Sequence, residues 1–392
     1  MRAPTTRRRL AFASLVAGAM LLGTACSSAE SDTDEGPASG GGGIASEIKL
    51  VGVRDTTGPV AYAGLGASKG SALAVDEIND QGFLGEGVTL TLEEVDSANE
   101  IERASSEMSK AVADPEVMAI LGPAAGQQAA TVAPMVEQAK VPTVFTQAGS
   151  DGVVIGDYTF RATAPMSTYY HLAAEWLADE GLTNVAVLYN ATFPTFAELG
   201  EKVFPALAEE NGLTLASSDA VQSTTQDFSA QAQAIASRKP DAVVMFLIAP
   251  QSVTAMTQLR QAGYEGQFVA TSVQAAGNVA EAGENAAGLV YPVDFSVAQT
   301  DEGAAAFTEG FTKKFGEAPD PYAAEGYDAV WWIARAIKAS GDSSREGIKE
   351  GLQQVAGEGF EGAMGALTFE GNDMRVPGVL VRWDGSAEQL VE

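Results

Sequence analysis

The sequence has almost none of the residues that build metal sites and disulfides. Among its 392 residues there is one cysteine, Cys26, and one histidine, His171. A single cysteine cannot form a disulfide within one chain, and no second imidazole exists for a His-based metal site. A structural disulfide and a metal centre built on His or Cys are therefore excluded, and no cofactor is expected.

Basic residues and catalytic signatures are also scarce. The chain has 23 Lys and Arg against 52 Asp and Glu, a formal net charge of −29, which repels phosphate backbones. There is no Gly-x-x-x-x-Gly-Lys-Ser/Thr phosphate loop, and Gly64-Leu65-Gly66 lacks the third glycine of a dinucleotide fingerprint. The sequence predicts a globular protein that is not an enzyme and does not bind nucleic acid.

No segment has the roughly 18 consecutive apolar residues of a transmembrane helix. The apolar run Leu10 to Leu22 is shorter, follows Arg7-Arg8-Arg9 and precedes Gly23-Thr24-Ala25-Cys26. A basic region, an apolar region and small residues before a cut are typical of an export signal, here residues 1–25. Residues 26–43 are small, acidic and Gly-rich, which predicts a flexible tether.

This leader resembles a bacterial lipoprotein signal, in which the new N-terminal cysteine is acylated on its sulfur. Cys26 stands at the expected cut, although Gly23 occupies the position where Leu is usual. The resemblance implies a lipid anchor at Cys26 on the extracytoplasmic side of the cell membrane; the alternative is a free thiol in a linker. Arg7-Arg8-Arg9 also resembles a twin-arginine signal, so the export route, Sec or Tat, stays open.

After the tether, short β-rich runs alternate with helical apolar patterns, first from 47 to about 145 and again from about 168. Such alternation predicts two α/β lobes, each a doubly wound parallel sheet. The strands expected are 48–53, 88–95, 117–121, 141–145, 185–189, 213–221, 242–248, 268–270 and, last, 379–383. Helices are expected to begin near Thr168, Thr195, Asp227 and Gln251, and to run over 303–315, 321–340 and 344–355.

Doubly wound sheets bind ligands at the carboxyl ends of their strands. In this chain those ends are followed by loops rich in Gly, Ala and Thr, namely 54–64, 122–128 and 146–150. Small residues let backbone N–H groups approach a ligand, and a helix that begins near Gln127 directs its positive end to the same place.

Together these segments resemble the extracytoplasmic solute-binding proteins of the leucine/isoleucine/valine type, which deliver ligands to ABC importers. The resemblance spans about Ile48 to Asp384. It depends on motifs that follow one another at the family's spacing: Ile48-Lys49-Leu50-Val51-Gly52-Val53 with Thr57-Gly58-Pro59, Ala72-Leu73-Ala74-Val75-Asp76-Glu77-Ile78-Asn79, Ala119-Ile120-Leu121-Gly122-Pro123, Val141-Pro142-Thr143, Phe160-Arg161, Pro240-Asp241-Ala242-Val243 and Tyr322-Ala323-Ala324-Glu325-Gly326-Tyr327-Asp328-Ala329.

The resemblance implies the periplasmic binding protein type I fold, in which two lobes joined by three crossing segments close on a ligand. Mapped onto this chain, lobe 1 would be residues 44–163 plus 293–366, and lobe 2 would be 164–292 plus 367–392. The implied partners are a small-molecule ligand and the membrane permease of an ABC importer, and the protein is expected to be a monomer.

The resemblance also implies where the ligand lies. In amino-acid-binding members, Ser or Thr hydroxyls and backbone amides hold the α-carboxylate, and an acid in lobe 2 pairs with the ammonium. The matching positions here are Gly126, Ser150 and Gln274, so the acid is missing. A lobe 2 aromatic could be Phe193 or Phe196. The expected ligand contacts are Arg54, Tyr62, Ala124, Gly126, Gln127, Ala148, Gly149, Ser150, Phe196 and Gln274.

The identity of the ligand stays open at this stage. Branched-chain amino acid is the class that the resemblance implies, but Arg54 suits a carboxylate and Gln274 offers only a neutral amide. A small amide such as urea, or an organic acid, is therefore the alternative. Arg54 has an alternative of its own, an internal ion pair with Asp55 or another acid. A tethered ligand sensor without a transport role is the competing function, and an anchored hydrolase a third.

Overall fold

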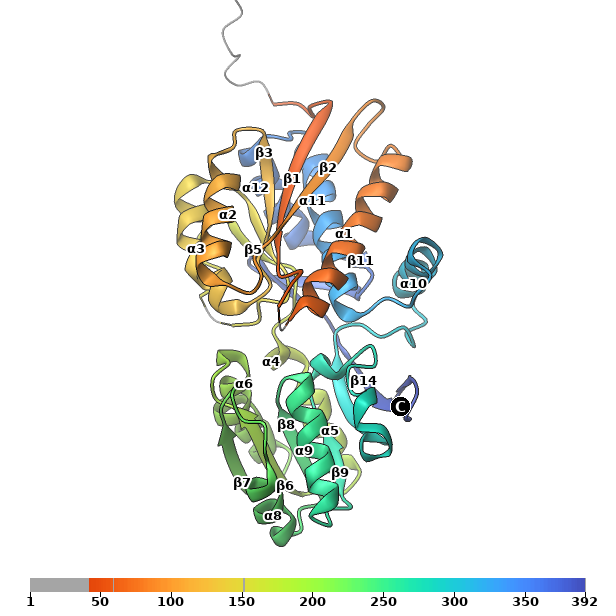
Figure 1. Ribbon diagram of the computed structural model, residues 1–392. Coiled ribbons are helices and arrows are strands. Elements are labelled where there is room, and N and C mark those ends of the chain that lie inside the picture. The colour runs from red at the N-terminus through yellow and green to blue at the C-terminus, as the bar shows by residue number, and fades with distance from the viewer. Residues whose placement is uncertain (1–41, 59, 151, 392) are drawn as a thin grey trace, which may run out of the picture. The chain divides into compact units, whose positions relative to one another are not determined.

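The computed structural model describes residues 42–58, 60–150 and 152–391, which leaves the leader and Cys26 outside the described residues. Residues 42–392 form one unit by their contacts and contain two sheets, each covered by helices (Figure 1). Two mixed, mainly parallel sheets of this kind confirm the fold class predicted from the alternating pattern.

The first sheet has the strand order β11-β12-β13-β5-β4-β3-β1-β2. The strands from β13 to β2 are parallel neighbours, and β12 and β11 add an antiparallel edge. Its strands are β1 (Glu47–Arg54), β2 (Thr89–Asp96), β3 (Val117–Gly122), β4 (Thr143–Phe145), β5 (Thr159–Arg161), β11 (Phe360–Gly362), β12 (Gly365–Glu370) and β13 (Asp373–Arg375). Its helices are α1 (Ala61–Asp80), α2 (Ile101–Ala113), α3 (Gly126–Ala139), α10 (Glu302–Phe315), α11 (Pro321–Ser340) and α12 (Arg345–Glu358).

The second sheet has the order β15-β14-β10-β9-β8-β6-β7, with β10 to β7 parallel and β14 and β15 antiparallel. Its strands are β6 (Asn184–Asn190), β7 (Thr214–Val221), β8 (Ala242–Phe246), β9 (Gln267–Val269), β10 (Val290–Val293), β14 (Val379–Trp383) and β15 (Glu388–Leu390). The remaining helices are α4 (Met166–Tyr169), α5 (His171–Asp179), α6 (Pro194–Glu198), α7 (Phe204–Glu210), α8 (Ser229–Arg238) and α9 (Ala249–Gln261), with a π-helical turn η1 (Leu199–Val203) and 3₁₀ segments η2 (Ser272–Gln274) and η3 (Ala280–Ala286).

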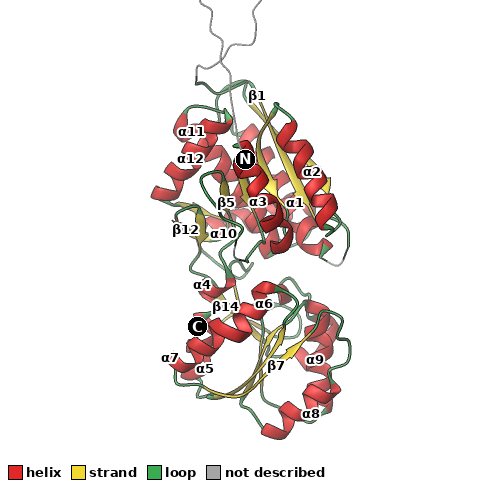
Figure 2. Cartoon of the chain, turned by 90° about the vertical axis from the view of Figure 1, so that its left-hand side faces the viewer, coloured by secondary structure: helices red, strands yellow, loops and turns green. Residues whose placement is uncertain are grey.

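Both sheets are sandwiched between helices because successive strand residues point to opposite faces. In β1, Ile48 and Leu50 pack with α1, α10, α11 and α12, whereas Val51 and Val53 pack with α2 and α3. The second sheet follows the same rule, with α8 and α9 on one face and α5 and α7 on the other (Figure 2). The central strands β3, β6 and β8 are therefore almost continuously apolar, whereas the edge strands β2 and β7 are more polar.

The chain passes between the sheets three times, and each passage is marked by a change of core. Tyr169 is buried in the first core and Tyr170 in the second. Val293 closes β10 in the second sheet, and two residues later Phe295 packs in the first core. On the third passage, the first core ends at Val376.

Two expectations about these passages need correction. β12 and β13 pair in the first sheet, so the third passage lies between β13 and β14 rather than near residue 367. The helix expected to begin near Thr168 begins at Met166 after Pro165 and breaks between Tyr169 and His171. The break occurs where the chain leaves one core for the other, and the Thr168 hydroxyl, inside the first turn, donates to the Pro165 carbonyl.

Candidate functional site

A cavity of about 260 Å³ lies between the two sheets, at the carboxyl ends of their parallel strands. Its wall is built by the segments that follow β1, β2, β3, β4 and β5 of the first sheet and β6, β8, β9 and β10 of the second, with the first turns of α11. Ligands of doubly wound sheets bind at this edge, because loops there are free to vary while strands hold them in place.

Most of the expected contact residues line this cavity. They are Tyr62, Ala124, Gly126, Gln127, Gly149, Ser150 and Phe196, and Phe193 lines it as well. The two phenylalanine rings lie 5.9 Å apart, so both aromatics left open by the sequence belong to the same wall. Their contact with a ligand stays a prediction.

Arg54 does not line the cavity and is fully buried. Its guanidinium donates to the Thr146 hydroxyl and, at 3.3 Å, to the Ser71 hydroxyl, and its Nε lies 3.8 Å from Glu94 Oε1. Arg54 has the strand parity of Ile48 and Leu50, which directs its side chain toward α1. The arrangement matches the internal ion pair considered as the alternative, with Glu94 rather than Asp55 as the acid.

Gln274 and Ala148 are also buried outside the cavity wall. The Gln274 side-chain amide donates to Ser252 Oγ at 3.0 Å and to the Leu247 carbonyl at 3.4 Å, within the second lobe. The residue that faces the cavity from this segment is Ser272, two positions earlier, together with Val273. Sequence reasoning therefore misplaced the register in the short η2 turn.

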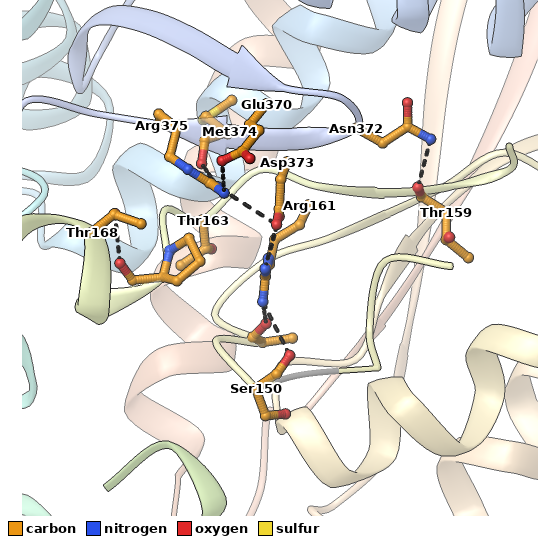
Figure 3. Close-up of polar contacts among 12 residues, drawn as sticks. Ser150, Thr159, Arg161, Thr163, Thr168, Glu370, Asn372, Asp373, Met374 and Arg375 are labelled. Atoms are coloured by element: carbon orange, nitrogen blue, oxygen red, sulfur yellow. Dashed lines mark hydrogen bonds and ion pairs between the residues drawn. The ribbon is translucent and has the colours of Figure 1, made fainter. Parts of the chain in front are cut away.

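The loop that carries Gly149 and Ser150 is fixed by Arg161, a residue whose role the sequence did not indicate (Figure 3). Arg161 Nη1 donates to the carbonyls of Ala148 and Ser150, both at 3.1 Å. Its Nε and Nη2 donate to the two carboxylate oxygens of Asp373 on β13, at 2.5 and 2.6 Å. A bidentate pair of this kind is rigid, so the cavity loop is tied to the strand before the third passage.

The opposite side of this loop meets the start of α3. A Cβ placed on Gly126 would lie 2.1 Å from Ser150 Oγ, so the serine hydroxyl occupies the space of a side chain at 126. The first backbone N–H groups of α3 have no partner within the helix and carry its positive dipole end. This hydroxyl and these N–H groups can together hold an anionic group such as a carboxylate.

Two acids that sequence reasoning did not single out line the cavity, Asp294 and Glu325, each 3% exposed. The Glu325 carboxyl accepts a hydrogen bond from the Gln147 side chain. Burial raises the pKa of both carboxyls, that of Glu325 well above its usual range. Signals for both were present, because Asp294 directly follows the strand-like run 289–293, and Glu325 lies inside the motif Tyr322-Ala323-Ala324-Glu325.

The structure does not support a hydrolase nucleophile or a metal site in the described residues. Gly66-Ala67-Ser68-Lys69-Gly70 has the spacing of a hydrolase nucleophile motif, but that motif needs a turn between strand and helix, and the whole stretch lies inside α1. Within the described residues, no three His, Cys, Asp or Glu side chains are grouped to hold a metal ion. In the same part of the chain, no helix is both long and apolar enough to cross a bilayer.

Comparison with known proteins gives one consistent family. The chain is 24% identical over 351 residues to Leu/Ile/Val-binding protein homolog 7 of Brucella abortus, covering 83% of this chain and 86% of the relative. The leucine-binding protein LivK of Thermotoga maritima superposes with a TM-score of 0.78 at 25% identity, covering 88% of this chain and 98% of that one. LivJ of Streptococcus pneumoniae, solved with isoleucine, gives a TM-score of 0.77 at 24% identity, with coverage of 88% and 99%.

The family model described as "Periplasmic binding protein" matches residues 47–387, which include every strand of both sheets except β15, the three passages and every segment of the cavity wall. The resemblance inferred from the motifs is thereby confirmed, and the chain belongs to the periplasmic binding protein family.

Proposed function

We propose that this protein is the ligand-capturing component of an ABC importer and that its ligand is an amphipathic amino acid of the branched-chain type. The observation that carries the proposal is the cavity lined from both sheets, whose wall offers polar groups as well as aromatic and aliphatic side chains. Relatives named for leucine, isoleucine and valine support the ligand class.

The two parts of the wall suit the two parts of such a ligand. The α3 N-terminus, with Gly126 and Ser150, offers donors for a carboxylate. Phe193, Phe196 and Val273 offer an apolar surface for a branched side chain. Burying this side chain supplies affinity, and the polar groups fix its orientation.

A thermal-shift screen over amino acids, small amides and carboxylates tests the proposal. Selective binding raises the melting temperature by mass action, by an amount set by the ratio of ligand concentration to Kd. We expect leucine, isoleucine or valine to give the largest shift, and small-angle scattering to show a smaller radius of gyration with that ligand. A screen in which only amides or only carboxylates stabilise the protein would assign a different ligand class.

We further propose that a lipid on Cys26 holds the protein at the outer face of the cell membrane. Cys26 lies outside the described residues, so the support is the sequence pattern alone. Cys26→Ser should release the protein from the membrane fraction or leave its leader uncut. Because stable anchoring needs two or more acyl chains, we expect more than one lipid chain at this cysteine. Wild-type protein that is wholly soluble in its own organism would contradict the anchor.

A further inference from the structure

The cavity wall brings two buried carboxyl groups together from different parts of the chain. Asp294 follows β10 on the second passage between the sheets, and Glu325 lies in the second turn of α11. Both line the same cavity and both are 3% exposed, and each carboxyl group affects the pKa of the other. Two neighbouring carboxyl groups can share a hydrogen bond only when one of them carries a proton.

The surroundings of this pair explain why the proton stays. Among the described residues that line the cavity there is no Lys, Arg or His. Two adjacent buried carboxyls without a facing cation cannot both ionise, because like charges repel and burial penalises each charge. Burial accordingly raises the pKa of Asp294 and of Glu325, and Asp294 raises that of Glu325 further.

The pair is nevertheless incomplete as a hydrogen-bonding unit. Glu325 accepts from the Gln147 side chain, whereas Asp294 Oδ1 is buried and has no hydrogen-bond partner among the described residues. A buried carboxylate oxygen without a donor is costly, and native structures leave few of them. An unpartnered acceptor in a cavity wall indicates that a ligand supplies the donor.

The charged and titratable groups near the pair come from several elements and leave the cavity side free of positive charge. Arg54 acts on Glu325 electrostatically from β1, but it does not line the cavity. The groups near the pair are Arg54 on β1, Tyr62 on α1, Tyr169 on α4, and Tyr322 and Asp328 on α11. The three tyrosines have raised pKa values and stay neutral near pH 7.

We propose that Asp294 and Glu325 form the ammonium-binding subsite of the cavity, and that the proton they share is released when a primary ammonium group of the ligand binds. In the free protein one carboxyl is neutral and the other is an anion. In the complex both are anions that face the ammonium, and one proton has left to solvent, so charge and atoms balance. A primary ammonium is the fitting cation because its three N–H donors can bond Asp294 Oδ1 and Glu325 together.

This inference rests on the proposed function, since it assigns one end of the ligand in the same cavity. It also supplies the acid that Gln274 does not provide. Release of a proton makes affinity depend on pH by linkage, so the association constant should rise with pH, up to about tenfold per unit, while the free pair is protonated. The ligand's own ammonium keeps its charge over that range, because α-amino pKa values lie above about 7.7.

Titration calorimetry of the wild-type protein at pH 6, in two buffers of different ionisation enthalpy, measures the protons released. The probes are L-leucine, 3-methylbutylamine, which keeps the ammonium and lacks the carboxylate, and 4-methylpentanoate, which keeps the carboxylate and lacks the ammonium. We expect proton release approaching one per leucine and per amine, and none with 4-methylpentanoate. Leucine binding without proton release would overturn the inference. The measurement uses the wild-type protein, so it does not depend on whether a variant folds.

Variants then assign the effect to residues. Asp294→Asn should weaken leucine binding at least tenfold and leave 4-methylpentanoate unaffected, and Glu325→Gln should abolish proton release. The control is Asp320→Asn, which removes a nearby carboxyl whose pKa is also raised, to about 6, but which does not line the cavity and can still cap α11. Unchanged leucine affinity in Asp294→Asn, or proton release lost in the control, would overturn the assignment.

The probes also separate this inference from the proposed function. Wild-type protein that prefers 4-methylpentanoate to leucine and to the amine would retain a solute-binding cavity and refute the ammonium subsite. Wild-type protein that binds none of the three would refute the proposed ligand class and the subsite together.

Discussion

The contact between Arg161 and Asp373 allows the most quantitative test of how the cavity loop is held. The two side chains are only 8% and 16% exposed, and the pair is bidentate. Removing one partner of a buried pair costs about 3–5 kcal/mol when the other charge is left uncompensated, and here Arg375, 3.5 Å from the Asp373 carboxylate, offsets part of that cost. Arg161→Met also leaves the Ala148 and Ser150 carbonyls without this donor. We therefore expect unfolding free energy to fall by about 3–5 kcal/mol.

The milder variant Asp373→Asn keeps one acceptor for Arg161 and leaves the two carbonyl contacts in place. Its expected cost is about 1.5–3 kcal/mol, the range for a hydrogen bond to a charged group. Because Gly149 and Ser150 line the cavity, we expect both variants to weaken ligand binding as well, by about tenfold or 1.4 kcal/mol.

Urea denaturation gives the stabilities, and titration calorimetry gives the affinities. Arg375→Met is the matched control, since Arg375 lies 3.5 Å from the same carboxylate and bonds the 83%-exposed Glu370. An exposed pair contributes about 0–1 kcal/mol, so the control should change little. Equal losses in Arg161→Met and Arg375→Met, or an Asp373→Asn variant with wild-type stability and affinity, would refute this account.

Three further predictions concern packing and pH. Gly126→Ala should weaken binding because its Cβ would meet Ser150 Oγ at 2.1 Å, and adding Ser150→Gly should recover stability; calorimetry and melting curves of both variants test this. Gly70→Ala should cost at least about 1–3 kcal/mol in urea unfolding, because its Cβ would lie 1.8 Å from the Ala323 carbonyl where α1 and α11 cross. Burial raises the Glu325 pKa, so the protonated carboxyl contributes fully to folding stability below about pH 4, and this contribution is lost as pH rises through the raised pKa. The melting temperature of the wild type should therefore fall more than that of Glu325→Gln between pH 5 and 8. Parallel melting curves would contradict this.

The regular part of the fold was predictable because it depends on continuous apolar runs. The ranges expected for α11 and β14 coincide with those observed, and the helices covering both sheets follow from the same periodicity. Strands β4, β5, β9, β11, β13 and β15 have three residues each, and of these only β4 and β9 were expected. Runs this short carry no measurable period, and their pairing is decided by distant residues.

The site was predictable in its loops and less so in its side chains. Glycine-rich strand ends placed Gly126 and Ser150 correctly in the wall, because loop position follows from topology. Whether a polar residue at a strand end faces the cavity depends on parity and on the partner helix. For that reason the Arg54 side chain is buried beside α1 and does not face the cavity. Gln274 is buried at the end of a 3₁₀ turn whose first residue, Ser272, faces the cavity instead. Asp294 follows a strand-like run and Glu325 lies in a motif, but nothing in the sequence shows that the two line the same cavity.

On the proposed function, the passages between the sheets give the acid pair and the loops different parts in ligand capture. Asp294 lies on a passage, between Val293 in one core and Phe295 in the other, and Glu325 belongs to the first lobe. In a hinge closure, the residues on the passages absorb the backbone change, residues of one lobe keep their mutual positions, and residues of the other lobe move. Glu325 and the donors at Gly126 and Ser150, all in the first lobe, should therefore form a constant set that a ligand can reach before closure. Phe193, Phe196 and Ser272 follow strands of the second sheet, so their approach completes the enclosure of the apolar side chain. Affinity in the open form should thus come from the charged ends of the ligand, and discrimination among side chains from closure.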